Sequence, residues 1–182
     1  MTMKEVSIPV RDGITIGAAI YAPEGGGRFP ALLAAAPYRY DNNTLPAGPQ
    51  FLWRETGPIE FYVKSGYAYV HMDVRGSGKS GGRFELLGLN EQRDLYDVIE
   101  WIAKQPWSNG KVGGLGQSYF CMAQWWMGIM APPALACLGA YDGLNDPYRA
   151  SCYQGGIPGQ VFPGYWWNQN RIINRFPANG AA

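Results

Sequence analysis

The segment GLGQSYFC, residues 114–121, places one serine between a glycine-rich apolar run and a helix-forming run. The first run predicts a short buried strand and the second a helix, so Ser118 is expected at a strand-to-helix turn. A serine on such a turn, with small residues two positions away on each side, is typical of the nucleophile elbow of acyl-transfer enzymes. Gly116 fills the small position before the serine, but Phe120 occupies the one after it. Serine also favours the N-cap of a helix, so the motif alone leaves both interpretations open.

A backbone N–H beside this serine would serve the same chemistry. The N–H of Tyr119 is expected in the first turn of the predicted helix, where it has no partner inside the helix. It would point at the oxyanion that forms on an attacked carbonyl, and the helix dipole would strengthen that bond. Ser118 and Tyr119 together therefore predict nucleophilic attack on an ester or amide.

The surrounding chain predicts the elements that must position this turn. Two β-rich runs flank the turn signal RDG at residues 11–13 and predict an antiparallel hairpin. Strand and helix patterns then alternate up to Gly143, which favours a parallel α/β sheet. The expected strands lie at 29–38, 67–74, 111–116 and 135–143, the expected helices at 58–66, 90–105 and 118–131, and a long loop at 41–57.

Composition narrows the class of protein. The chain has 182 residues, of which 47% are hydrophobic and 16% charged, as in ordinary globular domains. Its net charge of +1 comes without long like-charged runs, so nucleic acid is not expected as a partner. The three cysteines lack C-x-x-C spacing, and we expect neither a disulfide framework nor a metal or other cofactor. No run has the length of a signal peptide or a membrane span, which favours a cytoplasmic protein with no membrane partner.

Four longer stretches carry a resemblance to a known family. They are VRDGITIGAAIYAP, MDVRGSGKSGG, DLYDVIEWIAKQPWSNGKVGGLGQSY and GLNDPYRASCYQGG, in this order between about residue 4 and about residue 160. The chain resembles the cocaine esterase and X-Pro dipeptidyl-peptidase-like group of α/β-hydrolases, which includes α-amino acid ester hydrolases and cephalosporin acylases. The resemblance implies an α/β-hydrolase sheet, of which this chain would be the N-terminal part, truncated before the last strands.

The resemblance also implies roles for single residues. The serine of this family stands in G-x-S-Y-x-G, which matches Gly116, Ser118 and Tyr119, and places the small residue Cys121 at the last glycine. The family's second oxyanion donor is a tyrosine hydroxyl that follows a proline at the end of a strand. The segment APYRY, residues 36–40, puts Tyr38 at that place.

A glycine-rich loop follows the strand at 67–74. Its sequence RGSGKSGG does not have the order G-x-x-x-x-G-K-[ST], so a nucleotide-binding P-loop is not expected. The resemblance implies a structural turn near the active-site face. We expect a charge-assisted bond between Asp73 and Arg75 to hold its shape.

The acid and the base of a catalytic triad are not evident. In this fold the chain order is serine, then acid, then histidine, but the only histidine is His71, in the strand before the glycine-rich loop. The usual strand order puts it about 10 Å, two strand spacings of about 4.8 Å, from the serine, which favours a core histidine. Asp142 ends a predicted strand, where some α/β-hydrolases carry their acid, whereas the resembled family takes its acid from a later strand.

These observations predict a serine hydrolase that cleaves a small ester or amide through an acyl-enzyme. We expect the chain to be a fragment that lacks the catalytic Asp and His and has no efficient activity by itself. Residues 1–143 would form the N-terminal part of the hydrolase domain, and residues 144–182 the start of a helical cap. The alternative is a non-catalytic short form, a binding module with an aromatic pocket around Trp125, Trp126, Trp166 and Trp167.

Overall fold

A six-stranded sheet forms the centre of the molecule. The computed structural model describes residues 1–41 and 55–173. Within them the strand order of the large sheet is β1-β2-β4-β3-β5-β6, where β1 pairs with β2 and β2 with β4 antiparallel, and the other pairs are parallel. The strands are β1 (Thr2–Pro9), β2 (Thr15–Ala22), β3 (Phe29–Ala36), β4 (Ala68–Asp73), β5 (Ser108–Gln117) and β6 (Leu135–Tyr141). The predicted hairpin and the predicted parallel sheet are both confirmed.

The middle strands are apolar because both of their faces are covered. Every residue of β4 is buried, and β3 is buried over its last four residues. Continuous rather than alternating apolar runs are what a parallel sheet between helices requires. The core therefore lies around β3, β4 and the carboxyl end of β5, next to the predicted turn.

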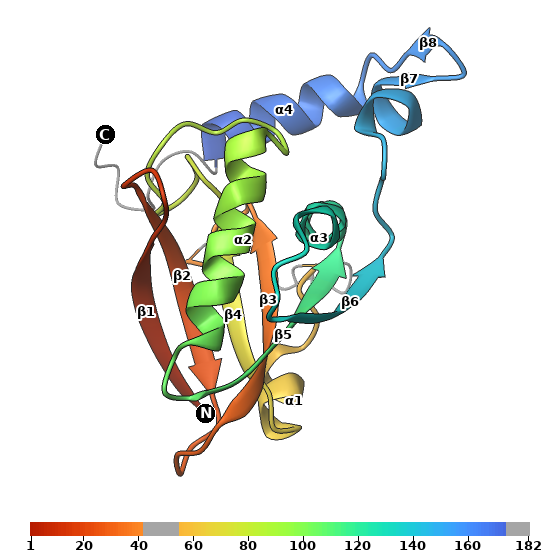
Figure 1. Ribbon diagram of the computed structural model, residues 1–182. Coiled ribbons are helices and arrows are strands. Elements are labelled where there is room, and N and C mark those ends of the chain that lie inside the picture. The colour runs from red at the N-terminus through yellow and green to blue at the C-terminus, as the bar shows by residue number, and fades with distance from the viewer. Residues whose placement is uncertain (42–54, 174–182) are drawn as a thin grey trace.

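Two helices cover one face of this sheet. Helix α2 (Leu89–Ala103) buries Leu95, Val98, Ile99 and Ile102, which recur at the spacing of one helix face. Helix α3 (Tyr119–Met130) follows β5 directly and packs against α2, β5 and β6. Both lie in front of the sheet in Figure 1, whereas the short α1 (Ile59–Lys64) packs against β4 and β2. The three helices occur where the sequence predicts them.

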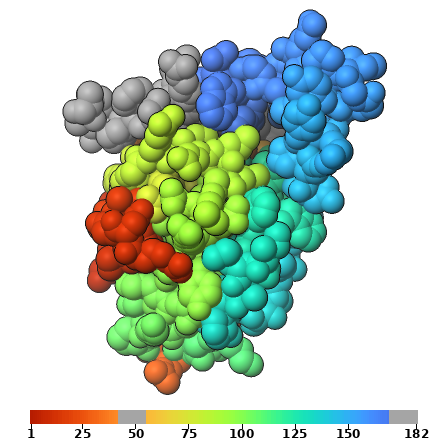
Figure 2. Space-filling view, turned by 45° about the horizontal axis from the view of Figure 1, so that its top comes forward, coloured from red at the N-terminus to blue at the C-terminus, as the bar shows by residue number. Residues whose placement is uncertain are grey.

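The segment after β6, expected as the start of a helical cap, forms elements that the sequence did not predict one by one. It contains a π-helical turn (Tyr148–Cys152), a two-stranded sheet of β7 (Tyr153–Gln154) and β8 (Ile157–Pro158), and helix α4 (Phe162–Ile173). Figure 1 shows α4 crossing the end of the large sheet, and Figure 2 shows this blue segment beside the yellow-green residues that precede α2. A domain boundary between residues 143 and 144 stays a prediction. None of the described helices combines the length and the apolar character that a membrane crossing requires.

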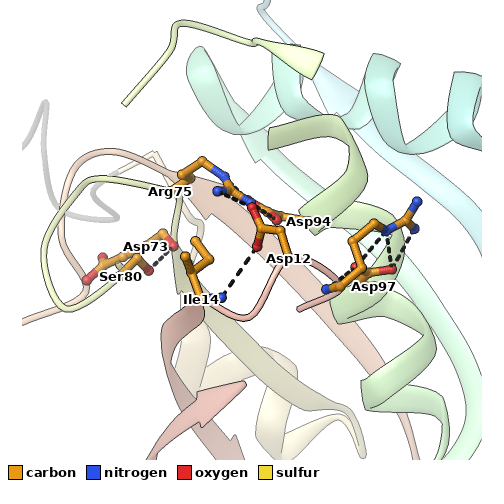
Figure 3. A network of polar contacts seen from close by, with 8 residues as sticks. Asp12, Ile14, Asp73, Arg75, Ser80, Asp94 and Asp97 are labelled. Atoms are coloured by element: carbon orange, nitrogen blue, oxygen red, sulfur yellow. Dashed lines mark hydrogen bonds and ion pairs between the residues drawn. The ribbon is translucent and has the colours of Figure 1, made fainter. Parts of the chain in front are cut away.

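A polar network fixes the loop after β4, and it corrects one expectation. Arg75 pairs with both oxygens of Asp94 at 2.8 and 2.6 Å and with Asp12 at 2.7 Å, as Figure 3 shows. Asp73 instead accepts the backbone N–H groups of Tyr40 and Lys79. The predicted bond between Asp73 and Arg75 is therefore wrong. Asp73 turns toward the loops at 40 and 79, whereas Arg75 reaches α2 and the hairpin turn.

Candidate active site

Ser118 stands on a sharp turn between β5 and α3. Its backbone has φ 59° and ψ −123°, in the region that favours glycine. Its N–H donates to the carbonyl of Asp142 at 3.0 Å, and its carbonyl accepts the N–H groups of Cys121 and Met122 at 3.0 Å each. The serine occupies the N-cap position of α3, but its hydroxyl makes no capping hydrogen bond. The structure thus has the strand-turn-helix geometry of a nucleophile elbow and leaves the hydroxyl unused by the helix.

Small residues allow this turn to pack. A Cβ added at Gly116 would overlap the Cβ of Phe120, so the requirement for glycine before the serine is steric. A Cβ added at Gly143 would overlap the sulfur of Cys121. Cys121 therefore fills the place of the family's last glycine while Gly143 supplies the space, and the bulky Phe120 points into the core, where it is 1% exposed.

The serine lies at the wall of a cavity of about 620 Å³. The polar groups at its wall include Ser118, Glu55 and Asp142, whereas much of the remaining lining is apolar. The apolar lining comes from α3, from the segment after β6 and from the loop before α2, and it includes Leu86, Met122, Leu144, Phe162, Trp166 and Trp167. A mainly apolar cavity with a few convergent polar groups is typical of a small-molecule site.

The structure brings Tyr38 to the serine. Its hydroxyl makes a polar contact with the Ser118 side chain and accepts the indole N–H of Trp166 at 3.2 Å. Its ring packs edge-on against the rings of Tyr119 and Phe120, at centroid distances of 6.2 and 5.8 Å. Burial raises the pKa of Tyr38 to about 12, so its hydroxyl is a neutral hydrogen-bond donor at physiological pH.

The backbone and the side chain of Tyr119 lie on different sides of the turn. Its N–H lies in the first turn of α3, beside the serine. Its side chain points behind the turn, where the hydroxyl lies 2.9 and 2.8 Å from the two oxygens of Glu91 and accepts the Leu87 N–H at 3.4 Å. Its ring stacks on Trp166 at 6.1 Å and 10°. Burial raises the pKa of Glu91 to about 8, so this carboxyl carries a proton at neutral pH.

A carboxyl that the sequence analysis missed lies beside the serine. Glu55 makes a polar contact with the Ser118 side chain, and its backbone carbonyl accepts the Gln117 N–H at 3.0 Å. Burial raises the pKa of Glu55 to about 7, and the charge of Asp142 adds to the effect. Its Oε2 atom is buried without a hydrogen-bond partner among the described residues. The site therefore contains a titratable acceptor next to the candidate nucleophile.

The two candidates for the rest of a triad lie apart from each other. Asp142 borders the cavity and accepts the side-chain N–H of Gln117 at 2.5 Å. His71 is on β4, separated from β5 by β3, and its ring packs against those of Phe120 and Tyr40 at 5.6 and 6.4 Å. At 5% exposed it is a core residue, as predicted.

The predicted aromatic pocket is divided in two. Trp166 and Trp167 border the cavity of the serine, whereas Trp125 and Trp126 line a separate one of about 220 Å³. Across residues 1–41 and 55–173, no group of three or more His, Cys, Asp or Glu side chains is placed to hold a metal ion.

Comparison with known proteins places this geometry in a family. Residues 12–178 match the model of the X-Pro dipeptidyl-peptidase (S15 family). A putative serine esterase of Mycobacterium bovis is 32% identical over 180 residues, and the cocaine esterase of a Rhodococcus species is 33% identical over 154 residues. These alignments cover 92% and 83% of this chain.

A solved structure agrees in fold as well as in sequence. The CocE/NonD family hydrolase of Staphylococcus aureus superposes with a TM-score of 0.84 at 35% identity, over 92% of this chain and 32% of that one. The chain spans 29% and 25% of the lengths of the two esterases. The matches confirm the predicted α/β-hydrolase sheet and its place in the N-terminal part of larger relatives. The chain belongs to the X-Pro dipeptidyl-peptidase (S15) family, together with the cocaine esterase-like hydrolases.

Proposed function

We propose that this chain carries the nucleophile and the oxyanion donors of a serine hydrolase that cleaves a small ester or amide through an acyl-enzyme. One observation carries the proposal: the Ser118 hydroxyl caps no helix and lies at the wall of a largely apolar cavity. The family and the named relatives are hydrolases, either esterases or peptidases. The finer assignment of roles rests on the geometry around Ser118.

In the proposed reaction the Ser118 oxygen attacks the carbonyl carbon of the substrate. The carbonyl oxygen becomes an oxyanion that the Tyr38 hydroxyl and the Tyr119 N–H stabilise, because both donors lie beside the serine. Trp166 supports this arrangement from the segment after β6, since it donates to Tyr38 and stacks on Tyr119. We propose residues 144–182 as the start of a cap over this site.

The proposal is tested by covalent labelling. A fluorophosphonate reacts with an activated serine, and intact-mass spectrometry measures the mass added to the protein. We expect one label per chain in the native protein and none in Ser118→Ala, with Ser77→Ala as the matched control because Ser77 is a buried loop serine that donates to a backbone carbonyl. Absence of label in the native protein would contradict the proposal and would favour a binding module instead.

A further inference from the structure

Gln124 is a polar residue of α3 that is buried without lining the cavity of the serine. It is 0% exposed, on a helix that packs against β5 and β6. In the described structure the wall of the cavity does not include it. Because a glutamine is seldom fully buried unless its amide is hydrogen-bonded, the partners of this amide indicate what the residue does.

The side-chain amide of Gln124 binds backbone carbonyls on both sides of Ser118. Its Nε2 atom donates to the carbonyl of Phe120, two residues after the serine, at 2.9 Å, and to that of Gly116, two residues before it, at 3.3 Å. A third contact, at 3.4 Å, reaches the carbonyl of Gly139 on β6. Since the amide has two N–H groups, the two longer contacts share one of them. One side chain thus connects the strand before the turn, the helix after it and the neighbouring strand.

The position requires a hydrogen-bond donor of this length. The Oε1 atom of Gln124 is buried without a hydrogen-bond partner in the described part of the chain, whereas Nε2 faces three carbonyls. A buried acceptor without a partner costs stability, so the bonds of Nε2 must offset this cost. The strand leaves room for the side chain, because a Cβ added at Gly114 on β5 would lie 2.7 Å from the Cγ of Gln124.

We propose that Gln124 is a positioning residue of the candidate active site, which keeps the turn of Ser118 in its strained form and so orients the serine hydroxyl and the Tyr119 N–H. The inference rests on the proposed function, because it requires Ser118 to be the nucleophile. The serine has φ 59° and ψ −123°, and such a backbone persists only where its surroundings fix it. The bonds of Gln124 fix the chain two residues before and two residues after this point.

The test compares Gln124→Met with the matched control Gln105→Met. Methionine has nearly the length and shape of glutamine but no N–H donor. Gln105 makes the same kind of bond, from Nε2 to the carbonyl four residues earlier, at 2.9 Å. It precedes the start of β5, whereas Ser118 follows the end of that strand. The control therefore removes an equivalent bond at the other end of β5.

Amide hydrogen exchange in the 182-residue chain measures the turn directly. The N–H groups of Cys121 and Met122 donate to the Ser118 carbonyl. In Gln124→Met we expect their exchange to become about tenfold faster relative to that of the Ile99 N–H on α2, because the turn opens locally. In Gln105→Met this ratio should not change.

Saturation kinetics of fluorophosphonate labelling measure the effect on the serine. In Gln124→Met the maximal rate constant should fall about 10- to 10²-fold, as expected when a reacting group is misplaced by about 1 Å. The half-saturating concentration should change little, because Gln124 does not line the described cavity. A residue that only stabilises the fold would leave both constants unchanged at temperatures well below unfolding.

A second variant disturbs the same contact while the amide is retained. In Gly114→Ala the added methyl group would overlap the Gln124 side chain and displace its amide. The exchange ratio and the maximal labelling rate should change in the same directions as in Gln124→Met. If Gln124→Met does not fold, as urea unfolding would show, Gly114→Ala provides the measurement.

The outcomes separate the two proposals. Equal maximal labelling rates in the native protein and in the two variants of this contact would overturn the positioning role and leave Ser118 as the nucleophile. Equally faster exchange on α2 and at the turn would also overturn it, because the amide would then stabilise the whole fold. A native chain that is not labelled would overturn the proposed function, and the positioning role with it.

Discussion

Two carboxyls flank the turn that carries Ser118, the buried Glu91 and the half-buried Glu55, and they differ in what surrounds them. Behind the turn, both oxygens of Glu91 lie within hydrogen-bonding distance of the Tyr119 hydroxyl, and the side chain is 1% exposed. In front of it, Glu55 borders a cavity and keeps one oxygen without a partner in the described structure. Burial raises the pKa of both groups. The comparison teaches that a carboxyl whose pKa is raised by burial belongs to the packed fold where both of its oxygens are paired. Such a carboxyl is available for chemistry where it borders a cavity.

The largest effect is expected away from the turn, in the network of the loop after β4, from Arg75→Ala. Asp94 has no exposed side-chain surface and would lose its bidentate partner. Breaking a buried ion pair from one side costs about 3–5 kcal/mol of stability, and urea unfolding at pH 7 measures this loss.

The matched control is Arg11→Ala. Arg11 makes a similar contact with both oxygens of Asp97, but its side chain is 45% exposed. An exposed pair contributes about 0.2–1 kcal/mol. Equal losses in the two variants would contradict the claim that the ion pair of Arg75 and Asp94 acts through burial.

In front of the turn, Tyr38→Phe is expected to impair turnover rather than stability. Removing one oxyanion donor lowers the rate about 10²- to 10³-fold. Saturation kinetics of Ser118 acylation by a 4-nitrophenyl ester should show the loss in the maximal rate constant with little change in the half-saturating concentration. Weaker binding with an unchanged maximal rate would mean that Tyr38 only packs against Tyr119 and Phe120.

Glu91→Gln should alter the dependence of stability on pH. A carboxyl whose pKa is about 8 in the folded state and ordinary in the unfolded state contributes stability that is fully present below the ordinary value. That stability is lost as the pH rises from about 4.5 through about 8, because unfolding then releases a proton. Glutamine does not titrate. Urea unfolding at pH 5, 7 and 8.5 should therefore show that the free energy of unfolding of the variant increases relative to that of the native protein as the pH rises. A constant difference across this range would mean that Glu91 titrates normally.

The smallest effect is expected from Lys64→Ala. Lys64 belongs to neither of the two regions that flank the turn of Ser118. Lys64 pairs with Glu60 one helical turn away on α1, and their side chains are 74% and 67% exposed. Such pairs contribute about 0.3–0.5 kcal/mol, so the unfolding midpoint in urea should scarcely move. A loss above about 1 kcal/mol would show that exposed charges matter more here than this comparison assumes.

Much of the fold could be predicted because local patterns determine it. The apolar runs that become β3 and β4 and the repeat of Leu95, Val98, Ile99 and Ile102 each lie within one element. The individual elements between Tyr148 and Ile173 were missed because the glycines, prolines and aromatic residues of this segment follow no helical or strand period. Its order comes from contacts with distant residues, such as Trp166 on Tyr119 and Trp167 on Phe84.

The candidate site was predictable only where a motif marks it. Ser118 and Tyr119 are adjacent in the chain, and Tyr38 follows a proline at a strand end, which the family resemblance identifies. Glu55 had no such signal, since it is one acid in a stretch predicted as loop, and the loop's residues 42–54 lie outside the described structure. Its contact with Ser118 arises from the bond between the Glu55 carbonyl and the Gln117 N–H, which no local spacing encodes.

The left-handed backbone of Ser118 has a consequence for how this protein would respond to selection. A non-glycine residue held at φ 59° and ψ −123° costs about 1–3 kcal/mol. Glycine adopts this conformation freely, although its more flexible unfolded chain returns about 0.4–1 kcal/mol of that gain. Ser118→Gly should therefore be neutral or stabilising, and a library sorted for heat resistance alone would accumulate it. The residue proposed to do the chemistry is the one that heat selection would discard first, so only a simultaneous demand for reaction with substrate would keep serine there.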